Sequence, residues 1–178
     1  MMRFLLGEIW DFLRFAFVVA LIGIPSFLVG ELIPRSRIRF REFPFRPFRF
    51  EDGGKFYEKF RIQAWKDRLP DMSKIMPRAF KKKLTRAALR DPRYVKRLIQ
   101  ETCSAEFVHW LLIALSPLVR RLMGDVDGAL AAFLYCVGNV PFIAIQRYNR
   151  PRLVALYEKQ LKHHAQPEDA VLQYTTTR

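Results

Sequence analysis

Apolar residues are concentrated in three stretches of the chain, and these stretches predict most of its helical structure. Residues 15–33 carry a single charge, Glu31, which a membrane interface can tolerate. Residues 107–119 form a shorter stretch, and residues 129–145 add 17 residues without a charge. A helix needs about 20 mostly apolar residues to cross a bilayer. We therefore predict membrane segments at about residues 15–33, 107–119 and 129–145, the first of them an N-terminal anchor.

The second and third stretches are predicted to form an antiparallel hairpin. Asp91 followed by Pro92 is typical of a helix start, and apolar residues then follow helical spacing, so we expect one helix from Pro92 to Val119. The connection at residues 120–128 is short, contains two glycines and favours a tight turn. Because both stretches are short for a span, a re-entrant hairpin that returns to the same membrane face is an alternative.

The region between the first and second membrane segments has amphipathic patterns. Residues 55–69 and 77–90 can each form a helix with apolar residues on one face and basic residues elsewhere. The predicted fold class is thus an all-α integral membrane protein with about three membrane helices and a basic amphipathic helical region. We expect a single membrane-embedded domain over residues 1–165 and a disordered tail at 166–178.

The distribution of charge predicts how the membrane segments are oriented across the bilayer. The chain has 31 Lys or Arg against 17 Asp or Glu, a formal net charge of +14, and residues 34–106 hold 21 of the basic and 9 of the acidic residues. The positive-inside rule places residues 34–106 and the C-terminus in the cytoplasm, and the N-terminus and residues 120–128 outside. We expect a multi-pass protein of the cell membrane.

Composition narrows the expected partners. A strong basic excess suits nucleic acid, an anionic membrane surface or a phosphorylated ligand. An apolar content of 51%, with 16 Phe, favours the membrane, so no nucleic-acid partner is expected. The two cysteines and three histidines have no metal-ligand spacing, so no bound metal is expected. The sequence leaves the oligomeric state open.

The second helix carries the residues best suited to acid–base chemistry. Glu106 and His109 are three residues apart and share a helical face, and Glu101 lies two turns before His109 near the same face. A carboxylate beside an imidazole can fix its tautomer and raise its basicity, as deprotonation of a hydroxyl requires. We predict His109, Glu106 and Glu101 as catalytic residues, against the alternative of an interfacial histidine bonded only for packing.

Polar residues that follow the third segment are candidates for binding a donor or an acceptor. Arginine forks match phosphate or carboxylate oxygens, although arginines there also serve as a plain stop signal. An antiparallel hairpin would bring these residues and His109 to one cytoplasmic rim. Asn139, inside the third segment, makes either a helix–helix hydrogen bond or a ligand contact. The candidate binding residues are Asn139, Gln146, Arg147, Tyr148, Asn149, Arg150 and Arg152, with Trp65 and Lys66 able to close over them.

Several of these motifs together resemble a known family. Residues 51–66, the run Ala-Glu-Phe-Val-His-Trp at 105–110, Asn-Val-Pro at 139–141 and Gln-Arg-Tyr-Asn-Arg-Pro-Arg-Leu at 146–153 resemble the glycosyl-4,4'-diaponeurosporenoate acyltransferase family. The resemblance covers roughly residues 50–155. It implies a small membrane protein, and the founding activity esterifies a fatty acyl group onto the 6-hydroxyl of a glucose attached to a carotenoid, late in staphyloxanthin synthesis.

The leading hypothesis is transfer of a fatty acyl group from a thioester, expected to be acyl-CoA, to a hydroxyl of a lipid or glycolipid, with no bound cofactor. His109 would act as general base, Glu106 or Glu101 would orient it, and the arginines would bind phosphates or steady the oxyanion. One alternative is a non-enzymatic membrane-surface scaffold or lipid-binding protein, and another is a different lipid transferase such as a methyltransferase.

Overall fold

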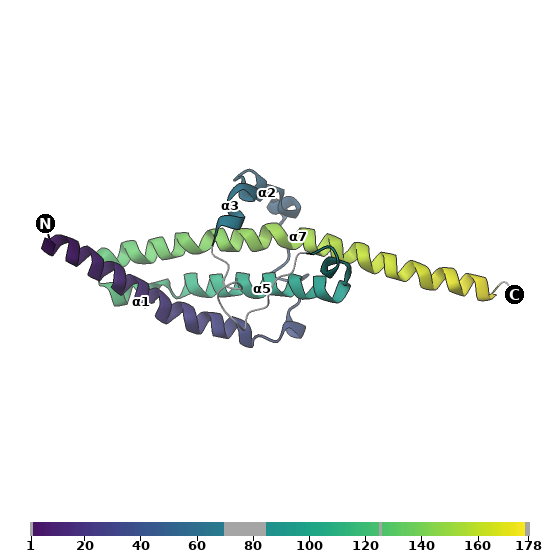
Figure 1. Ribbon diagram of the computed structural model, residues 1–178, viewed down its shortest axis with the longest axis horizontal. Helices are drawn as coiled ribbons and strands as arrows, with labels where there is room; N and C mark the ends of the chain where they lie inside the picture. The colour runs from purple at the N-terminus through teal and green to yellow at the C-terminus, as the bar shows by residue number, and fades with distance from the viewer. Residues whose placement is uncertain (1, 70–84, 125, 177–178) are drawn as a thin grey trace. The chain divides into compact units, whose positions relative to one another are not determined.

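The structure confirms an all-helical protein. The computed structural model describes residues 2–69, 85–124 and 126–176, and every regular element among them is an α-helix or a 3-10 helix (Figure 1). In chain order the elements are α1 (Met2–Leu32), η1 (Arg35–Arg37), η2 (Arg49–Gly54), α2 (Lys55–Glu58), α3 (Ile62–Trp65), η3 (Lys66–Arg68), η4 (Ala88–Arg90), α5 (Pro92–Ala114), α6 (Ser116–Met123) and α7 (Val126–Thr176).

Three helical stretches of the described chain are long and apolar enough to cross a membrane. They are Leu5–Leu32, Pro92–Met123 and Asp127–His163, so the prediction of about three membrane helices is confirmed. Each is longer than the apolar segment predicted from sequence, because the helices continue into polar residues on both sides of the uncharged run. These lengths are sufficient for a crossing, and the re-entrant hairpin over residues 107–145 stays an alternative.

The second predicted helix begins where the sequence indicated and is interrupted before its expected end. The Asp91 side chain accepts a hydrogen bond from the backbone N–H of Arg93 at 2.9 Å and so caps α5. Helix α5 ends at Ala114, and α6 begins at Ser116. Pro117 explains the break, since its ring would clash with a carbonyl one turn earlier. The single helix from Pro92 to Val119 was therefore wrong near its end.

The contacts of the chain divide it into two compact units. The first consists of residues 1–37 and 104–144, and the second of residues 38–103 and 145–178. Helices α5 and α7 contribute residues to both units. The prediction of one domain over residues 1–165 stays a prediction.

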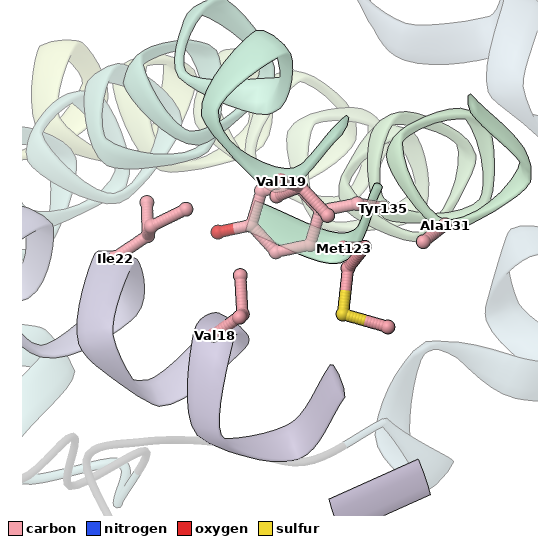
Figure 2. Close-up of a cluster of buried hydrophobic side chains, with 6 residues drawn as sticks. All are labelled: Val18, Ile22, Val119, Met123, Ala131 and Tyr135. Carbon is pink, nitrogen blue, oxygen red and sulfur yellow. The ribbon is translucent and has the colours of Figure 1, made fainter. Parts of the chain in front are cut away.

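In the first unit, three helices pack around a small apolar core. Figure 2 shows side chains from α1, α6 and α7 converging there, and the six residues are Val18, Ile22, Val119, Met123, Ala131 and Tyr135. Contacts also join residue 120 to Gly128, and His109 to Asn139. Since higher numbers on one helix meet lower numbers on the other, α5–α6 and α7 are antiparallel in this unit, as the sequence predicted.

Helix α1 makes a close crossing with α5 at Gly30. A Cβ added at Gly30 would collide with Cγ2 of Val108. The Gly30 carbonyl accepts hydrogen bonds from the Ser104 hydroxyl at 2.9 Å and from Arg35 Nη1 at 2.6 Å. Arg35 Nη1 also bonds the Ile33 carbonyl at 2.8 Å, so a buried arginine satisfies the carbonyls at the end of α1.

In the second unit, the region predicted as one helix over residues 55–69 is divided into short turns. Helix α2 ends at Glu58 and α3 begins at Ile62, because Arg61 adopts a left-handed backbone with φ 52°. A left-handed residue cannot continue a right-handed helix. The other predicted helix, 77–90, lies outside the described residues up to residue 84, and Ala88–Arg90 forms a 3-10 turn.

Helix α7 extends further than the sequence indicated. The backbone is helical to Thr176, where a disordered tail was predicted for residues 166–178. Residues 153–173 are rich in Leu, Ala, Glu, Gln and Lys, all good helix formers. Extending an existing helix also avoids the cost of a new nucleus. The disordered tail over residues 166–178 stays a prediction.

Candidate active site

The candidate base, His109, forms a hydrogen bond between two helices of the first unit. Its Nδ1 lies 2.8 Å from Oδ1 of Asn139, joining α5 to α7. Asn139 is buried, and its Nδ2 donates to the backbone carbonyl of Tyr135 at 2.8 Å, one turn earlier on α7. Asn139 thus makes the helix–helix hydrogen bond that was one of its two interpretations, and its partner is the predicted base.

These bonds fix the tautomer of the imidazole. The Tyr135 carbonyl can only accept, so the amide nitrogen of Asn139 must face it and the amide oxygen must face His109. That oxygen also can only accept, so Nδ1 of His109 carries the proton. In the neutral ring, Nε2 then holds the lone pair. A neutral histidine with its lone pair on Nε2 is the form that a general base requires.

The plane of the His109 ring is also constrained. It stacks on Phe142 with centroids 4.7 Å apart and an interplanar angle of 12°. The ring is half-buried, between full burial and free exposure. A hydrogen bond at one edge and an aromatic ring on one face together restrict both χ angles, so the direction of Nε2 is set before any substrate binds.

The two candidate carboxylates have other contacts among the described residues. Glu106 is buried, and its Oε1 accepts a hydrogen bond from Nε1 of Trp110 at 3.3 Å. Glu101 belongs to the second unit and forms an ion pair with Arg97 at 2.7 Å, one turn earlier on α5. The orienting partner that the structure gives to His109 is Asn139. The roles assigned to Glu106 and Glu101 stay predictions.

Arg147, a predicted phosphate ligand, is buried in an ion pair with Glu51 in the second unit. Its Nη1 donates to both carboxylate oxygens, at 2.9 and 3.0 Å, and Nη2 donates to the Pro44 carbonyl at 2.8 Å. Glu51 also accepts from the Phe48 backbone N–H at 2.8 Å and from the Tyr57 hydroxyl at 2.5 Å. Three donor atoms thus make four hydrogen bonds to one carboxylate, and this buried pair holds the segment 44–57 to α7.

Arg150 holds the same segment and α5 to α7. Its Nε and Nη2 donate to the side chain and carbonyl of Thr102, at 3.0 and 3.1 Å, and Nη1 donates to the Phe45 carbonyl at 2.7 Å. Arg150 is only 2% exposed. Two of the three predicted anion-binding arginines therefore use their donors to fix the protein backbone.

The third arginine, Arg152, is exposed and lies over an aromatic ring together with Lys66. Its guanidinium carbon is 3.7 Å from the ring centroid of Tyr148, and Nζ of Lys66 is 5.5 Å from the same centroid. Arg152 also pairs with Glu58 at 2.6 Å, and Gln63 donates to the Tyr148 hydroxyl at 2.6 Å. The structure therefore brings together Tyr148, Arg152 and Lys66.

Gly54 permits this arrangement. Its φ is +99°, and an added Cβ would lie 2.8 Å from Arg152 Nη1 and 3.1 Å from the Tyr148 carbonyl oxygen. Both the backbone conformation and the space therefore require glycine here. The close approach of the loop to α7 places Lys66, twelve residues further on, beside Tyr148.

The other predicted binding residues of the second unit are Trp65, Gln146 and Asn149. Trp65 donates from Nε1 to the Phe60 carbonyl at 3.0 Å, Gln146 is buried and Asn149 is half-buried. No group of three or more His, Cys, Asp or Glu within the described residues is arranged to hold a metal ion. His109 and Arg147 belong to different units, so the predicted meeting of base and arginines at one rim stays a prediction.

Two parts of this arrangement were not predicted from the sequence. Glu51, 96 residues before Arg147, was not identified as its partner, although an acid in a basic stretch is a weak signal of a buried pair. The stacking of His109 on Phe142 was also missed. Both contacts join segments far apart in sequence, and local spacing carries no information about them.

Comparison with known proteins gives consistent matches along most of this region. A sequence model described as glycosyl-4,4'-diaponeurosporenoate acyltransferase matches residues 41–159. Proteins with that name from Staphylococcus aureus strains MRSA252 and N315 are 33% and 31% identical to this chain, over 72% of the chain and 76% of each relative. The protein of that name from strain Newman is 32% identical with the same coverage. No solved structure matches.

Proposed function

The chain belongs to the glycosyl-4,4'-diaponeurosporenoate acyltransferase family and is therefore an acyltransferase, and from this premise we propose that it moves a fatty acyl group from a thioester to a hydroxyl of a glycosylated membrane lipid, with His109 as general base. Its relatives are named for a glycosylated carotenoid acid. A glycosylated carotenoid is accordingly the first acceptor to test. Family membership favours this enzymatic hypothesis over a non-enzymatic scaffold.

The observation that carries the proposed chemistry is the hydrogen bond from His109 Nδ1 to Asn139 Oδ1. It leaves Nε2 as the proton acceptor. The acceptor hydroxyl gives its proton to Nε2 while its oxygen attacks the thioester carbonyl carbon. The tetrahedral intermediate then collapses, the carbon–sulfur bond breaks, and the leaving thiolate takes the proton back from Nε2. The products are an ester and a thiol, and the imidazole returns to its starting form.

The same arrangement supports a membrane-embedded acceptor. His109 lies within the candidate span Pro92–Met123, and Asn139 lies within Asp127–His163. A base in such a segment suits a substrate whose lipid part stays in the bilayer while its sugar hydroxyl reaches the base. We propose, from the excess of basic residues at 34–106, that the sugar is acylated on the cytoplasmic side of the cell membrane, where acyl-CoA is available.

Arg152 and Lys66 are the basic residues best suited to the phosphates of acyl-CoA. Both lie on the Tyr148 ring, and Arg152 is exposed, whereas Arg147 and Arg150 are buried with protein partners. Under this proposal, the two buried arginines act by positioning residues 44–57. Contact with the donor phosphates, predicted for all three arginines, is then made by Arg152 together with Lys66. Both cations lie on the ring of Tyr148.

The test is acyl transfer by the purified protein. Labelled acyl-CoA and a glycosylated carotenoid, or a total lipid extract, are incubated with the wild-type chain and with His109→Ala, and products are identified by mass spectrometry. General base catalysis contributes about 10²- to 10⁴-fold, so His109→Ala should lose at least two orders of magnitude in rate while retaining its helical content. Full activity of the variant would overturn the base assignment.

The donor is distinguished in the same assay. Acyl-CoA is compared with an acyl thioester of N-acetylcysteamine, which lacks the phosphates. The phosphate proposal predicts that Arg152→Gln with Lys66→Gln raises KM for acyl-CoA and leaves KM for the short thioester unchanged. An equal change for both donors would mean that these residues do not bind phosphate.

A further inference from the structure

Residues 48–60 carry a connected series of aromatic rings. Phe48 stacks on Phe50 at 5.6 Å between centroids, Phe50 meets the edge of Phe56 at 5.3 Å, and Phe56 meets Phe60 at 5.4 Å. Pairs of this geometry are stabilised beyond the burial of their area. Phe48 directly precedes η2, and the other three rings come from η2, α2 and the turn after α2. Because the four rings contact one another in series, we call them the aromatic surface.

Three of the four rings are exposed although the rings contact one another, and Phe56 is half-buried. Phe50 is 61% exposed, Phe60 62% and Phe48 40%. Packing side by side shields only part of each ring, and the remaining apolar area faces outward. A contiguous exposed apolar patch marks an interaction site, whereas isolated exposed apolar residues do not. The aromatic surface is therefore a candidate interaction site.

Contacts with Glu51 and Arg147 hold the first residue of the aromatic surface, Phe48, in place. The Phe48 backbone N–H donates to Glu51, and the Phe48 ring lies under the guanidinium of Arg147, 4.3 Å from its carbon. The buried Glu51–Arg147 pair thus fixes the first ring, and the ring contacts extend that order to Phe60. Rigid placement lowers the entropy lost when the surface binds.

Charge indicates the chemistry of the partner. Arg46, Arg49, Lys59 and Arg61 are exposed in the same stretch of chain. The acids of the stretch are engaged in ion pairs, Glu51 with Arg147, Asp52 with Lys55 and Glu58 with Arg152. The charge presented around the rings is therefore positive. Aromatic rings interleaved with exposed basic side chains match the boundary between anionic headgroups and acyl chains.

We propose that the aromatic surface inserts its rings into the headgroup–acyl boundary of an anionic lipid leaflet, with Arg49 and Lys59 beside lipid phosphates. The chain holds this surface near a bilayer, because residue 48 follows the candidate span Leu5–Leu32 after a short connection. A tethered surface needs little intrinsic affinity, since the tether supplies a high effective concentration of lipid. The proposal concerns lipid binding and does not depend on the acyl transfer proposed above.

Photocrosslinking in the intact protein tests this contact. p-Benzoylphenylalanine, which keeps the phenyl ring of the native residue, replaces Phe50 or Phe60. A matched control places it at Asp67, an exposed polar position of η3. The full chain is reconstituted in vesicles of phosphatidylcholine and phosphatidylglycerol and irradiated, and the adducts are identified by mass spectrometry. Lipid adducts at residues 50 and 60 should exceed those at residue 67 several-fold.

A charge variant tests the anionic preference. A single basic side chain near an anionic surface is worth a factor of about five in binding, so Arg49→Gln should lower the share of phosphatidylglycerol adducts at residue 50 by up to about fivefold. Lipid adducts no more abundant at 50 and 60 than at 67 would overturn the proposal. Adducts to a second copy of the chain or to another protein would overturn it as well. These readouts need no activity, so they separate this proposal from the proposed function.

Discussion

Replacement of Asn139 by alanine tests the proposed base most directly. The variant removes the acceptor at 2.8 Å from His109 Nδ1 and leaves the ring stacked on Phe142. The imidazole can then place its proton on either nitrogen, and only one tautomer has the lone pair on Nε2. A net hydrogen bond is worth about 0.5–1.5 kcal/mol, which corresponds to a loss of about 2- to 13-fold in rate. We expect a fall in kcat of that size.

A double-mutant cycle separates this positioning role from a general loss of fold. Asn139 acts through His109 in our proposal, so Asn139→Ala should have no further effect on the residual rate of His109→Ala. The four proteins are compared by acyl transfer to the glycosylated carotenoid under saturating donor. Residues that act as a unit show strong non-additivity in such cycles. Additive losses would refute the reasoning, as would an unchanged rate in Asn139→Ala alone.

The neighbouring glycine supplies a matched control. Gly138 lies one residue before Asn139 on α7, and an added Cβ there has nothing within 4 Å. Gly138→Ala therefore changes the same turn of the helix without touching the hydrogen bond. It should keep the wild-type rate. Equal losses in Gly138→Ala and Asn139→Ala would indicate that this turn of α7 is sensitive to any change.

Two further predictions concern stability, read by thermal unfolding in detergent. Removing the charge of Glu51 by Glu51→Gln leaves a buried guanidinium uncompensated and should cost about 3 kcal/mol, whereas Glu58→Gln breaks an exposed pair and should cost under about 1 kcal/mol; equal effects would contradict the assigned burial. Gly30→Ala drives a methyl group against Val108 and should cost about 1–3 kcal/mol, whereas Gly23→Ala enters open space and should be neutral or stabilising; a neutral Gly30→Ala would refute the close crossing.

Hydropathy and helix signals predicted the membrane helices well, since both act locally. Asp91 and Pro92 marked the start of α5, and the side chain of Asp91 does cap it. The failures arose where backbone conformation is set by distant contacts. Arg61 adopts a left-handed conformation that propensity disfavours, and the predicted helix over 55–69 is broken there. Local preference could not reveal this, because the turn is stabilised by contacts of residues 51–66 with α7.

The candidate site shows the same division between local and distant information. The sequence identified His109 and Asn139 separately, and the hairpin predicted that their helices would be antiparallel. It paired His109 with Glu106 because a single helix reveals only neighbours on its own face, such as residues three or four apart. The register between two helices depends on side-chain packing, such as that of Val119 and Tyr135 in the core. Sequence alone does not specify that register, so Asn139 was not recognised as the partner.

The choice of an amide in place of a carboxylate beside His109 is consistent with the proposed reaction. In an apolar segment, a buried carboxylate is costly before any imidazolium has formed to pair with it. A neutral Asn139 fixes the tautomer without that cost. Acyl transfer from a thioester requires the imidazolium only briefly, because the proton taken from the hydroxyl leaves with the thiol. A partner that orients the ring but carries no charge therefore provides what this proton transfer needs, within a helix long and apolar enough to cross a membrane.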